Sequence, residues 1–335
     1  MNLLRKISAR AARSVVYLAR DLQHSLGLGN DIYKSAKGDR IILYHGVCNS
    51  EPLKFNTLFI TKKTFEAHLR FYKKHFNVVS MDDYYAQKFC KDKFNICLTF
   101  DDGFANNHKY VLPLLQQYQV PATFFITGIT SKGHDVLWND FISIFGKYGP
   151  DKIMVNDETY IKNRHKRYIS TTTGTGLIEK LWGCGFSEKE AIMKELSSLS
   201  PFKTNPSDYD YWQQMSASQI AELSASPFVT IGAHSLYHND LARININDTM
   251  AELIKSKLFL ENITQKSIGS FAFPYGSYNP EVIAATKRAG YTQLLATAFL
   301  NQADKSDATM RERFTINPFI SVNNQMRATI KGSYE

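Results

Sequence analysis

Strand-like and helix-like segments alternate along most of this sequence, and this alternation restricts the chain to a small set of folds. The predicted strands are short runs rich in β-branched and aromatic residues, and most segments between them carry apolar residues at helical spacing. Such alternation predicts parallel strands joined by helical crossovers. The predicted strands are residues 40–46, 77–80, 94–100, 122–127, 228–234, 267–273, 291–297 and 313–321.

The number of predicted strands favours a closed barrel. Seven or eight parallel strands fit a deformed (β/α) barrel, and the alternative is an open doubly wound sheet. No glycine-rich phosphate loop follows the first predicted strand, which argues against the open sheet. The chain has 335 residues and is 44% hydrophobic, which is sufficient for one barrel with an insertion. We therefore predict an α/β fold with a single barrel over residues 38–335.

Two parts of the chain depart from the alternation. Residues 131–215, called here the inserted segment, contain helix-like pieces and predict a helical insertion on one face of the barrel. Residues 1–37 predict a basic N-terminal helical extension. Within it, residues 1–23 carry five Arg or Lys side chains against a single acid, Asp21. This composition is typical of a helix on an anionic membrane surface, and it fits a solvated or packed helix equally well.

Charge and hydropathy limit where the protein works and what it binds. No segment approaches the length of a transmembrane helix, and Arg10 and Arg13 interrupt any signal-peptide core. We therefore expect a protein that is cytoplasmic or peripheral at the inner membrane face. The formal net charge of +9 arises partly in the N-terminal extension, and no nucleic-acid recognition motif is present, so we expect no nucleic-acid partner. The four cysteines lack CxxC spacing, which argues against a cysteine zinc site.

The strand predicted at 94–100 ends in two adjacent carboxylates, Asp101 and Asp102. Like charges at the end of a buried strand repel each other, and a bound cation would offset that repulsion. His234 directly follows another predicted strand, and His238 lies four residues later. Because the carboxyl ends of barrel strands open on one face, we expect these four side chains to converge. Nitrogen and oxygen ligands with one open position are typical of a catalytic zinc site, beside which a second carboxylate can act as general base.

Three segments, TFDDG at 99–103, HSLYH at 234–238 and FAFPYG at 271–276, resemble the first three motifs of the polysaccharide deacetylases, the NodB-type carbohydrate esterases. The resemblance implies a deformed (β/α) barrel and metal-dependent removal of N- or O-acetyl groups from sugars. The implied substrate is an N-acetylated oligo- or polysaccharide, such as a bacterial cell surface polysaccharide, or a glycan precursor.

The resemblance also assigns roles to individual residues. It implies that Asp101 is the base and that the metal ligands are Asp102, His234 and His238. It implies that the backbone N–H of Tyr275 stabilises the oxyanion, within the stretch Phe273, Pro274 and Tyr275. Zinc is the expected metal, and cobalt, nickel or manganese could occupy the same ligands.

The chain departs from the family pattern in three ways. The third motif usually carries an arginine that orients the base, and Ala272 stands in that place; Arg311 or Arg313 could substitute from another strand. The family's fourth motif, an acid followed by tryptophan, is not found after residue 276. No histidine follows His238, whereas the family's general acid usually lies near the C-terminus.

The segment LYH at residues 43–45 offers a replacement for that general acid. It lies on the first predicted strand, which neighbours the last strand in a closed barrel. It is similar to the circularly permuted branch of the family, seen among exopolysaccharide deacetylases, with His45 as the acid; the alternative is a histidine that simply ends a strand. Asp240 could orient a ligand imidazole or cap the segment that follows.

Two other functions remain open at this stage. One is a catalytically inactive barrel that binds glycans, against which the intact carboxylate pair and HSLYH segment argue. The other is a deacylase of lipid-linked sugars, which the basic residues 1–23 suggest.

Overall fold

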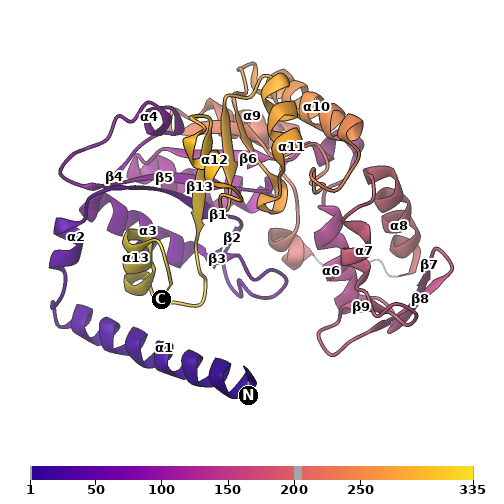
Figure 1. Ribbon diagram of the computed structural model, residues 1–335, viewed down its shortest axis with the longest axis horizontal. Coiled ribbons are helices and arrows are strands. Elements are labelled where there is room, and N and C mark those ends of the chain that lie inside the picture. Colours follow the sequence, from indigo (N-terminus) through magenta and orange to yellow (C-terminus); the bar gives the residue numbers. More distant parts are fainter. Residues whose placement is uncertain (1, 200–205, 335) are drawn as a thin grey trace.

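Seven parallel strands close into a barrel, which confirms the predicted fold class (Figure 1). The computed structural model describes residues 2–199 and 206–334, with side chains described from Arg13 onward. Around the barrel, β1 is hydrogen-bonded to both β13 and β5, and this double pairing closes the sheet. The strands, in their order around the barrel, are β1 (Asp39–Tyr44), β13 (Met310–Thr315), β12 (Gln293–Ala296), β11 (Ser270–Ala272), β10 (Val229–Ala233), β6 (Ala122–Ile126) and β5 (Phe94–Phe100).

Short strands extend the barrel at its margin. An eighth parallel strand, β4 (Phe76–Val78), pairs with the first half of β5, and β2 (Val47–Cys48) pairs with β3 (Ile60–Thr61). All seven residues of β5 are buried, which is expected of a strand covered on both faces in a parallel sheet. The apolar run at 94–100 is therefore a core strand, and the polar residues that follow it begin at the barrel edge.

Helices cover the outside of the barrel, as the alternation predicted (Figure 1). Their ends follow local sequence signals: Thr61 caps α3 by accepting a hydrogen bond from the Thr64 amide, and Asn279 caps α11 with Pro280 in the first turn. These helices are α2 (Asp31–Ser35), α3 (Lys62–His75), α4 (Met81–Tyr85), α5 (Leu112–Tyr118), α9 (Ala217–Ala225), α10 (Ile246–Thr264), α11 (Pro280–Arg288), α12 (Gln302–Ser306) and α13 (Val322–Lys331). A π-helical turn, Asn107–Val111, precedes α5.

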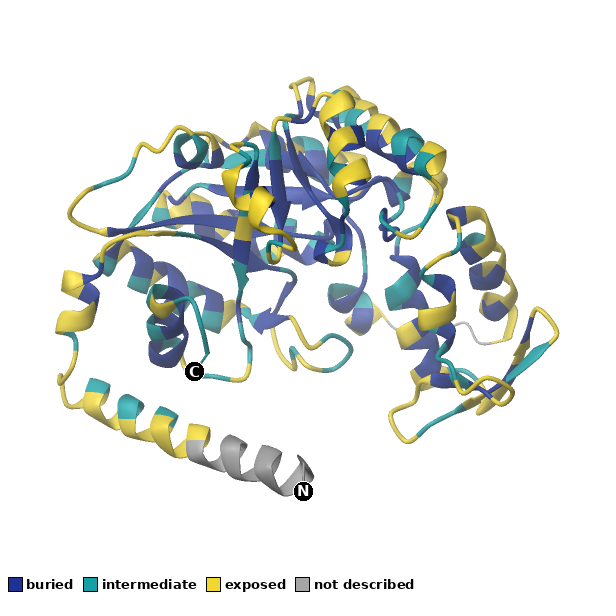
Figure 2. Ribbon diagram, in the orientation of Figure 1, coloured by how far each residue is buried: buried dark blue, intermediate teal, exposed yellow. Residues whose placement is uncertain are grey.

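The inserted segment packs around a second apolar cluster, which includes Trp138, Phe145 and Tyr168 and is shared with Phe59 and Phe104 from outside the segment. Figure 2 shows buried residues along the inner sides of its helices. It contains more than the predicted helical pieces, because three of its strands form an antiparallel sheet. Its elements are a 3-10 turn at Ile129–Lys132, α6 (Trp138–Tyr148), β7 (Lys152–Val155), β8 (Glu158–Lys162), β9 (Tyr168–Ser170), α7 (Leu177–Leu181), α8 (Phe186–Leu199) and a 3-10 turn at Pro206–Tyr211.

The N-terminal helix α1 (Asn2–Ser25) packs on the barrel with its polar side and leaves its apolar side exposed. Its polar side contacts the barrel: the Asp21 carboxylate accepts hydrogen bonds from Ser321, Asn323 and Asn324 at the start of α13, at 2.7 to 2.9 Å. The apolar side of its described part faces solvent, where Val15, Leu18, Leu22 and, just after the helix, Leu26 are 63 to 70% exposed (Figure 2). Within the described residues, none of the helices combines the length and the apolar character that crossing a bilayer requires.

Candidate metal centre

The candidate site lies where several barrel strands end. Asp101 directly follows β5, His234 follows β10 and His45 follows β1. Tyr44 pairs with Phe100 in the β1–β5 register, and the Asp101 amide donates to the Tyr44 carbonyl at 3.0 Å. His45 and Asp101 therefore leave the barrel side by side at the same edge.

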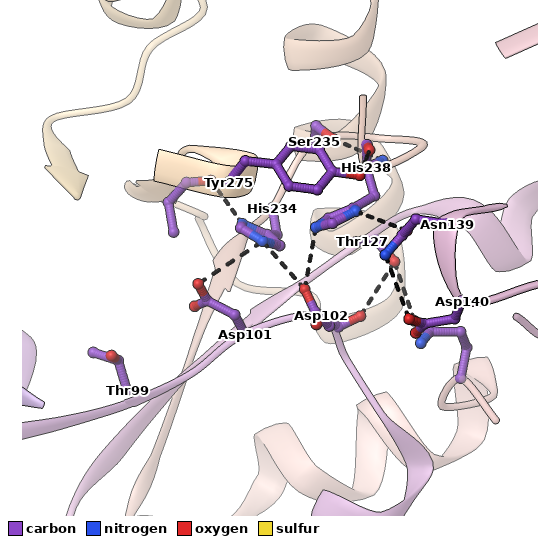
Figure 3. Close-up of polar contacts among 12 residues, drawn as sticks. Thr99, Asp101, Asp102, Thr127, Asn139, Asp140, His234, Ser235, His238 and Tyr275 are labelled. Carbon is purple, nitrogen blue, oxygen red and sulfur yellow. Dashed lines mark hydrogen bonds and ion pairs between the residues drawn. The ribbon is translucent and has the colours of Figure 1, made fainter. Parts of the chain in front are cut away.

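Asp102, His234 and His238 come together as a group that could hold a metal ion (Figure 3). One ligand atom from each lies within 4.8 Å of the others, and all three residues are buried. The Asp102 Oδ1 atom is 3.4 Å from Nε2 of His234 and 3.2 Å from Nε2 of His238. Gly103, with φ of 81°, turns the chain after Asp102 where a Cβ atom would lie 2.9 Å from Ile126.

The second nitrogen of each imidazole has a partner of its own. Nδ1 of His234 lies 2.8 Å from the Ala272 carbonyl oxygen, and Nδ1 of His238 lies 3.2 Å from Oδ1 of Asn139. A carbonyl oxygen can only accept, so each Nδ1 carries a proton. In the neutral imidazole Nε2 is then the unprotonated nitrogen that a metal ion would need, and in the imidazolium it donates to Asp102. This arrangement fits a metal site, because ligand histidines commonly donate their other ring N–H to such an acceptor.

The charges in this cluster shift one another's protonation. Burial would raise the pKa of Asp102, but the hydrogen bonds with His234 and His238 hold it well below its usual range. Burial would lower the pKa of His234, but the carboxylates of Asp101 and Asp102 raise it overall. For His238, burial prevails and the pKa is lowered.

The other carboxylate of the pair, Asp101, is bound by Arg313 of β13. The guanidinium donates two hydrogen bonds, from Nη1 to Oδ1 at 2.6 Å and from Nη2 to Oδ2 at 2.7 Å. Burial would raise the pKa of Asp101, but the charge of Arg313 lowers it overall. Arg311 instead lies over the Tyr85 ring, 4.8 Å from its centre. Of the two arginines considered from sequence, Arg313 contacts the carboxylate.

The FAFPYG segment forms a 3-10 turn, Pro274–Gly276, at the end of β11. The Tyr275 ring lies 4.7 Å from the His238 ring, between centres, and is 40% exposed. The two backbone hydrogen bonds of the turn are donated by the amides of Gly276 and Ser277 rather than by Tyr275. Phe273 is fully buried and packs on Phe271 in the core, so its side chain supports the turn from beneath.

His45 lies within the electrostatic field of the same carboxylates. Burial lowers the pKa of His45, while Asp102 and Asp101 act in the opposite direction. Its Nδ1 atom is buried and has no hydrogen-bond partner among the described residues. His45 thus carries an unused polar atom beside the candidate site.

Asp240 belongs to a different contact. Its carboxylate is 3.1 Å from Nε of Arg243 and accepts a hydrogen bond from the Ala242 amide at 3.2 Å. The imidazoles are instead oriented by Ala272 and Asn139, so the orienting role weighed for Asp240 is wrong.

Sequence reasoning missed the contribution of the first turn of α6. Asn139 contacts His238, and the neighbouring Asp140 lies close enough to Asp102 for its charge to matter (Figure 3). Burial and the Asp102 charge raise the pKa of Asp140 well above its usual range. Neither residue belongs to a motif. The one sequence signal is that both directly follow an apolar Val-Leu-Trp run, which indicates that the helix begins in a buried position.

Comparisons with known proteins give a consistent result. The sequence model of a family described as polysaccharide deacetylase matches residues 88–156 and 202–294. YxkH of Bacillus subtilis (strain 168), named as a polysaccharide deacetylase, is 20% identical over 266 residues, which cover 77% of this chain and 63% of the relative. The chain thus spans less than two thirds of that relative's length. The matched ranges contain Asp101, Asp102, His234 and His238 but neither His45 nor Arg313.

Solved structures share the fold. The Streptococcus pyogenes deacetylase PplD, in complex with acetate, has a TM-score of 0.52 at 17% identity and covers 87% of this chain and 97% of its own. BC0361, a polysaccharide deacetylase from Bacillus cereus, has a TM-score of 0.53 at 18% identity over 87% of this chain and 68% of its own. IcaB from Ammonifex degensii has a TM-score of 0.52 at 16% identity over 89% and 98%. None of these likenesses confirms the circularly permuted branch, which stays a prediction.

Proposed function

We propose that this chain, which belongs to the polysaccharide deacetylase family, is a metal-dependent hydrolase that removes N- or O-acetyl groups from a glycan. The observation that carries the proposal is the division of labour between two adjacent carboxylates. Asp102 faces two imidazole Nε2 atoms, whereas Asp101 is bound by Arg313. A purely structural acid pair would not need two buried histidines oriented toward one point.

Asp102, His234 and His238 would hold the metal. Zinc suits one carboxylate and two imidazoles, and cobalt, nickel or manganese could replace it. When bound there, such an ion lowers the pKa of water to about 7 and so makes a nucleophile available at neutral pH.

The chain's own groups would then move the protons. Asp101 accepts a proton from the attacking water, and Arg313 keeps this carboxylate ionised and correctly turned for that purpose. The Tyr275 N–H donates to the oxygen that becomes negative as the acyl carbon turns tetrahedral. His45 gives a proton to the leaving amine, which would otherwise depart as a very poor anion.

The test is acetate release from a panel of N-acetylated oligosaccharides and lipid-linked sugars. We expect release in the presence of zinc or cobalt, loss of release with a chelator, and recovery when metal is added back. His238→Ala should lose most metal and activity. Undiminished activity in metal-free protein would overturn the proposal. Glycan binding without turnover in metal-loaded protein would instead favour the inactive binding barrel.

A finer proposal concerns α1 and the place where the enzyme meets its substrate. Its exposed apolar side chains and the cations Arg13 and Arg20 fit an anionic bilayer surface, which would bring the enzyme to membrane-associated glycan precursors. Residues 1–12, which carry the other three basic side chains, lie outside the described side chains. Near an anionic surface each basic residue contributes on the order of 1 kcal/mol.

A truncated chain that begins near Gly38 tests this finer proposal. It should keep the barrel and its metal content but lose sedimentation with vesicles that contain phosphatidylglycerol. Leu18→Ser combined with Leu22→Ser, in the full chain, should weaken vesicle binding without changing acetate release from soluble oligosaccharides. Equal sedimentation of all three proteins with the vesicles would contradict the proposal that α1 binds a membrane surface.

A further inference from the structure

The first turn of α6 lies directly against the metal-ligand residue His238. The indole N–H of Trp138 donates a hydrogen bond to the His238 backbone carbonyl at 3.0 Å, and Trp138 is fully buried. The next residue, Asn139, contacts the side chain of the same histidine. Two consecutive residues of the inserted segment thus contact both the backbone and the ring of His238.

The contact from Asn139 has a defined direction. Its amide nitrogen faces Oδ1 of Asp140 at 3.4 Å, which leaves its Oδ1 atom to accept from Nδ1 of His238 at 3.2 Å (Figure 3). A neutral imidazole carries its proton on only one nitrogen. Asn139 therefore favours the tautomer that leaves the Nε2 lone pair free for a cation.

A second layer of buried polar groups holds the backbone on both sides of His238. The Lys189 ammonium of α8 donates to Oδ1 of Asn239 at 2.5 Å and lies 4.2 Å from the centre of the Trp138 ring. The Glu252 carboxylate of α10 accepts from the Asn239 side chain at 2.5 Å and from the Tyr237 amide at 3.2 Å. The loop that carries His238 is therefore fixed between the inserted segment and a barrel helix.

The other ligand histidine provides an internal contrast. Nδ1 of His234 is held by the Ala272 backbone carbonyl, which belongs to the barrel strand β11. A backbone acceptor remains whatever side chain occupies its position. Only His238 depends on side chains from outside the barrel.

From these contacts we infer that the inserted segment is a positioning element of the metal centre, in which Asn139 sets the tautomer of His238 and Trp138 fixes its backbone. The inference rests on the proposed function for the identity of the ligands. It assigns to Trp138 and Asn139 a role that no motif of the chain indicates. The inserted segment is then required for metal affinity as well as for packing.

The test uses the full chain and two measurements. Calorimetric titration with Zn²⁺ and the visible absorption of the Co²⁺ form report the metal site. Long-range ¹H–¹⁵N NMR of the histidine rings in metal-free protein reports the tautomers without any metal. Asn139→Leu keeps the branched shape but removes the acceptor, and we expect metal affinity to fall 10–100-fold and the Nδ1–H tautomer of His238 to lose its dominance. The His234 tautomer should not change.

Two further variants separate positioning from folding. Asn139→Asp restores an acceptor and should recover most of the affinity and the original tautomer. Trp138→Phe removes the N–H together with part of the buried ring, and it should weaken metal binding by at least about fivefold, the loss expected for one net hydrogen bond. The matched control is Asn163→Ala, because Asn163 also lies in the inserted segment and accepts two hydrogen bonds, from the His165 and Arg167 amides, but does not contact His238. It should leave both readouts unchanged.

The outcomes are distinct. Unchanged affinity and an unchanged His238 tautomer in Asn139→Leu would overturn the inference. An equal loss of affinity in Asn163→Ala would also overturn it, because the effect would then be general destabilisation. Failure of the wild-type chain to bind metal would instead defeat the proposed function, and the tautomer measurement would still decide whether Asn139 orients His238.

Discussion

The proposed metal centre has two halves that are built from different parts of the molecule. The proton half comprises Asp101, Arg313 and His45, which belong to or directly follow barrel strands β5, β13 and β1. The ligand half comprises Asp102, His234 and His238, and the last of these is held by the inserted segment. The boundary between the halves falls between two consecutive residues, Asp101 and Asp102. Strand register therefore fixes the proton half and His234, whereas packing of the inserted segment fixes His238.

The largest effect should come from separating the two carboxylates by isosteric substitution. Asp102→Asn should lose the metal and all measurable turnover, because a ligand is removed. Asp101→Asn should keep about one metal per chain while turnover falls by 10²–10⁴-fold, as is typical for a lost general base. Metal analysis and acetate release on the same samples check both results. If both variants kept, or both lost, their metal, the division into halves would be wrong.

His45→Ala tests the proposed proton donor of the proton half. We expect unchanged metal content and a 10²–10⁴-fold lower turnover on N-acetylated substrate, because the leaving amine loses its proton donor. An ester substrate, whose leaving alkoxide needs less help, should suffer less, and the ratio of amide to ester turnover is the measurement. Near-normal amide turnover would mean that the proton comes from another group or from water.

Arg313→Lys should have a smaller effect with a characteristic pH signature. Arg313 lowers the pKa of Asp101, so weakening the two-point ion pair should raise that pKa. The base is then protonated at higher pH, and the acid limb of kcat/KM should move upward, so that the loss of activity is largest at the acid end of the pH range and smallest near pH 8. A uniform loss across the pH range would contradict this role for Arg313. Thermal melts control for folding, because the Arg313 side chain is fully buried.

The smallest effect concerns a buried histidine outside both halves. His68 of α3 is 2% exposed and bonds the Tyr44 hydroxyl at 2.9 Å, and burial without a neighbouring anion lowers its pKa to about 3. The unfolded chain takes up this proton below about pH 6.5, so His68 should cost about 1.4 kcal/mol of stability per pH unit between roughly pH 6 and pH 3. His68→Gln should remove that slope without altering turnover. Urea unfolding at pH 7, 6 and 5 measures it, and equal slopes in both proteins would contradict the assignment.

Much of the fold, and the clustering of the candidate site residues, could be predicted from sequence because the signals are local. Runs such as residues 94–100 are both apolar and β-branched, and the chemistry begins at the first polar residue after them. The antiparallel sheet of the inserted segment was missed, although Asn156 and Asp157 between β7 and β8 are a recognisable two-residue turn, with φ of 48° and 59°. The turn was hidden because the strands it joins are short.

The supporting contacts could not be predicted for a different reason. Arg313 approaches Asp101 only because β1 closes the barrel between β13 and β5, and sequence alone left Arg311 as an equal choice. Asn139 and Ala272 act through packing between segments about 100 and 40 residues away from the histidines they orient. Such contacts depend on tertiary structure, and no periodicity or motif encodes them.

Four residues of the site, Asp102, Ser235, His238 and Tyr275, have left-handed backbones, with φ between 56° and 77°. This conformation costs a non-glycine residue roughly 1–2 kcal/mol. A descendant of this chain released from selection for catalysis could therefore relieve this backbone strain by acquiring glycine at Asp102 or His238, at the cost of the buried contacts of those side chains. Loss of the metal ligands and relief of backbone strain would then result from the same substitutions, so selection for catalysis is what keeps these residues in the left-handed conformation.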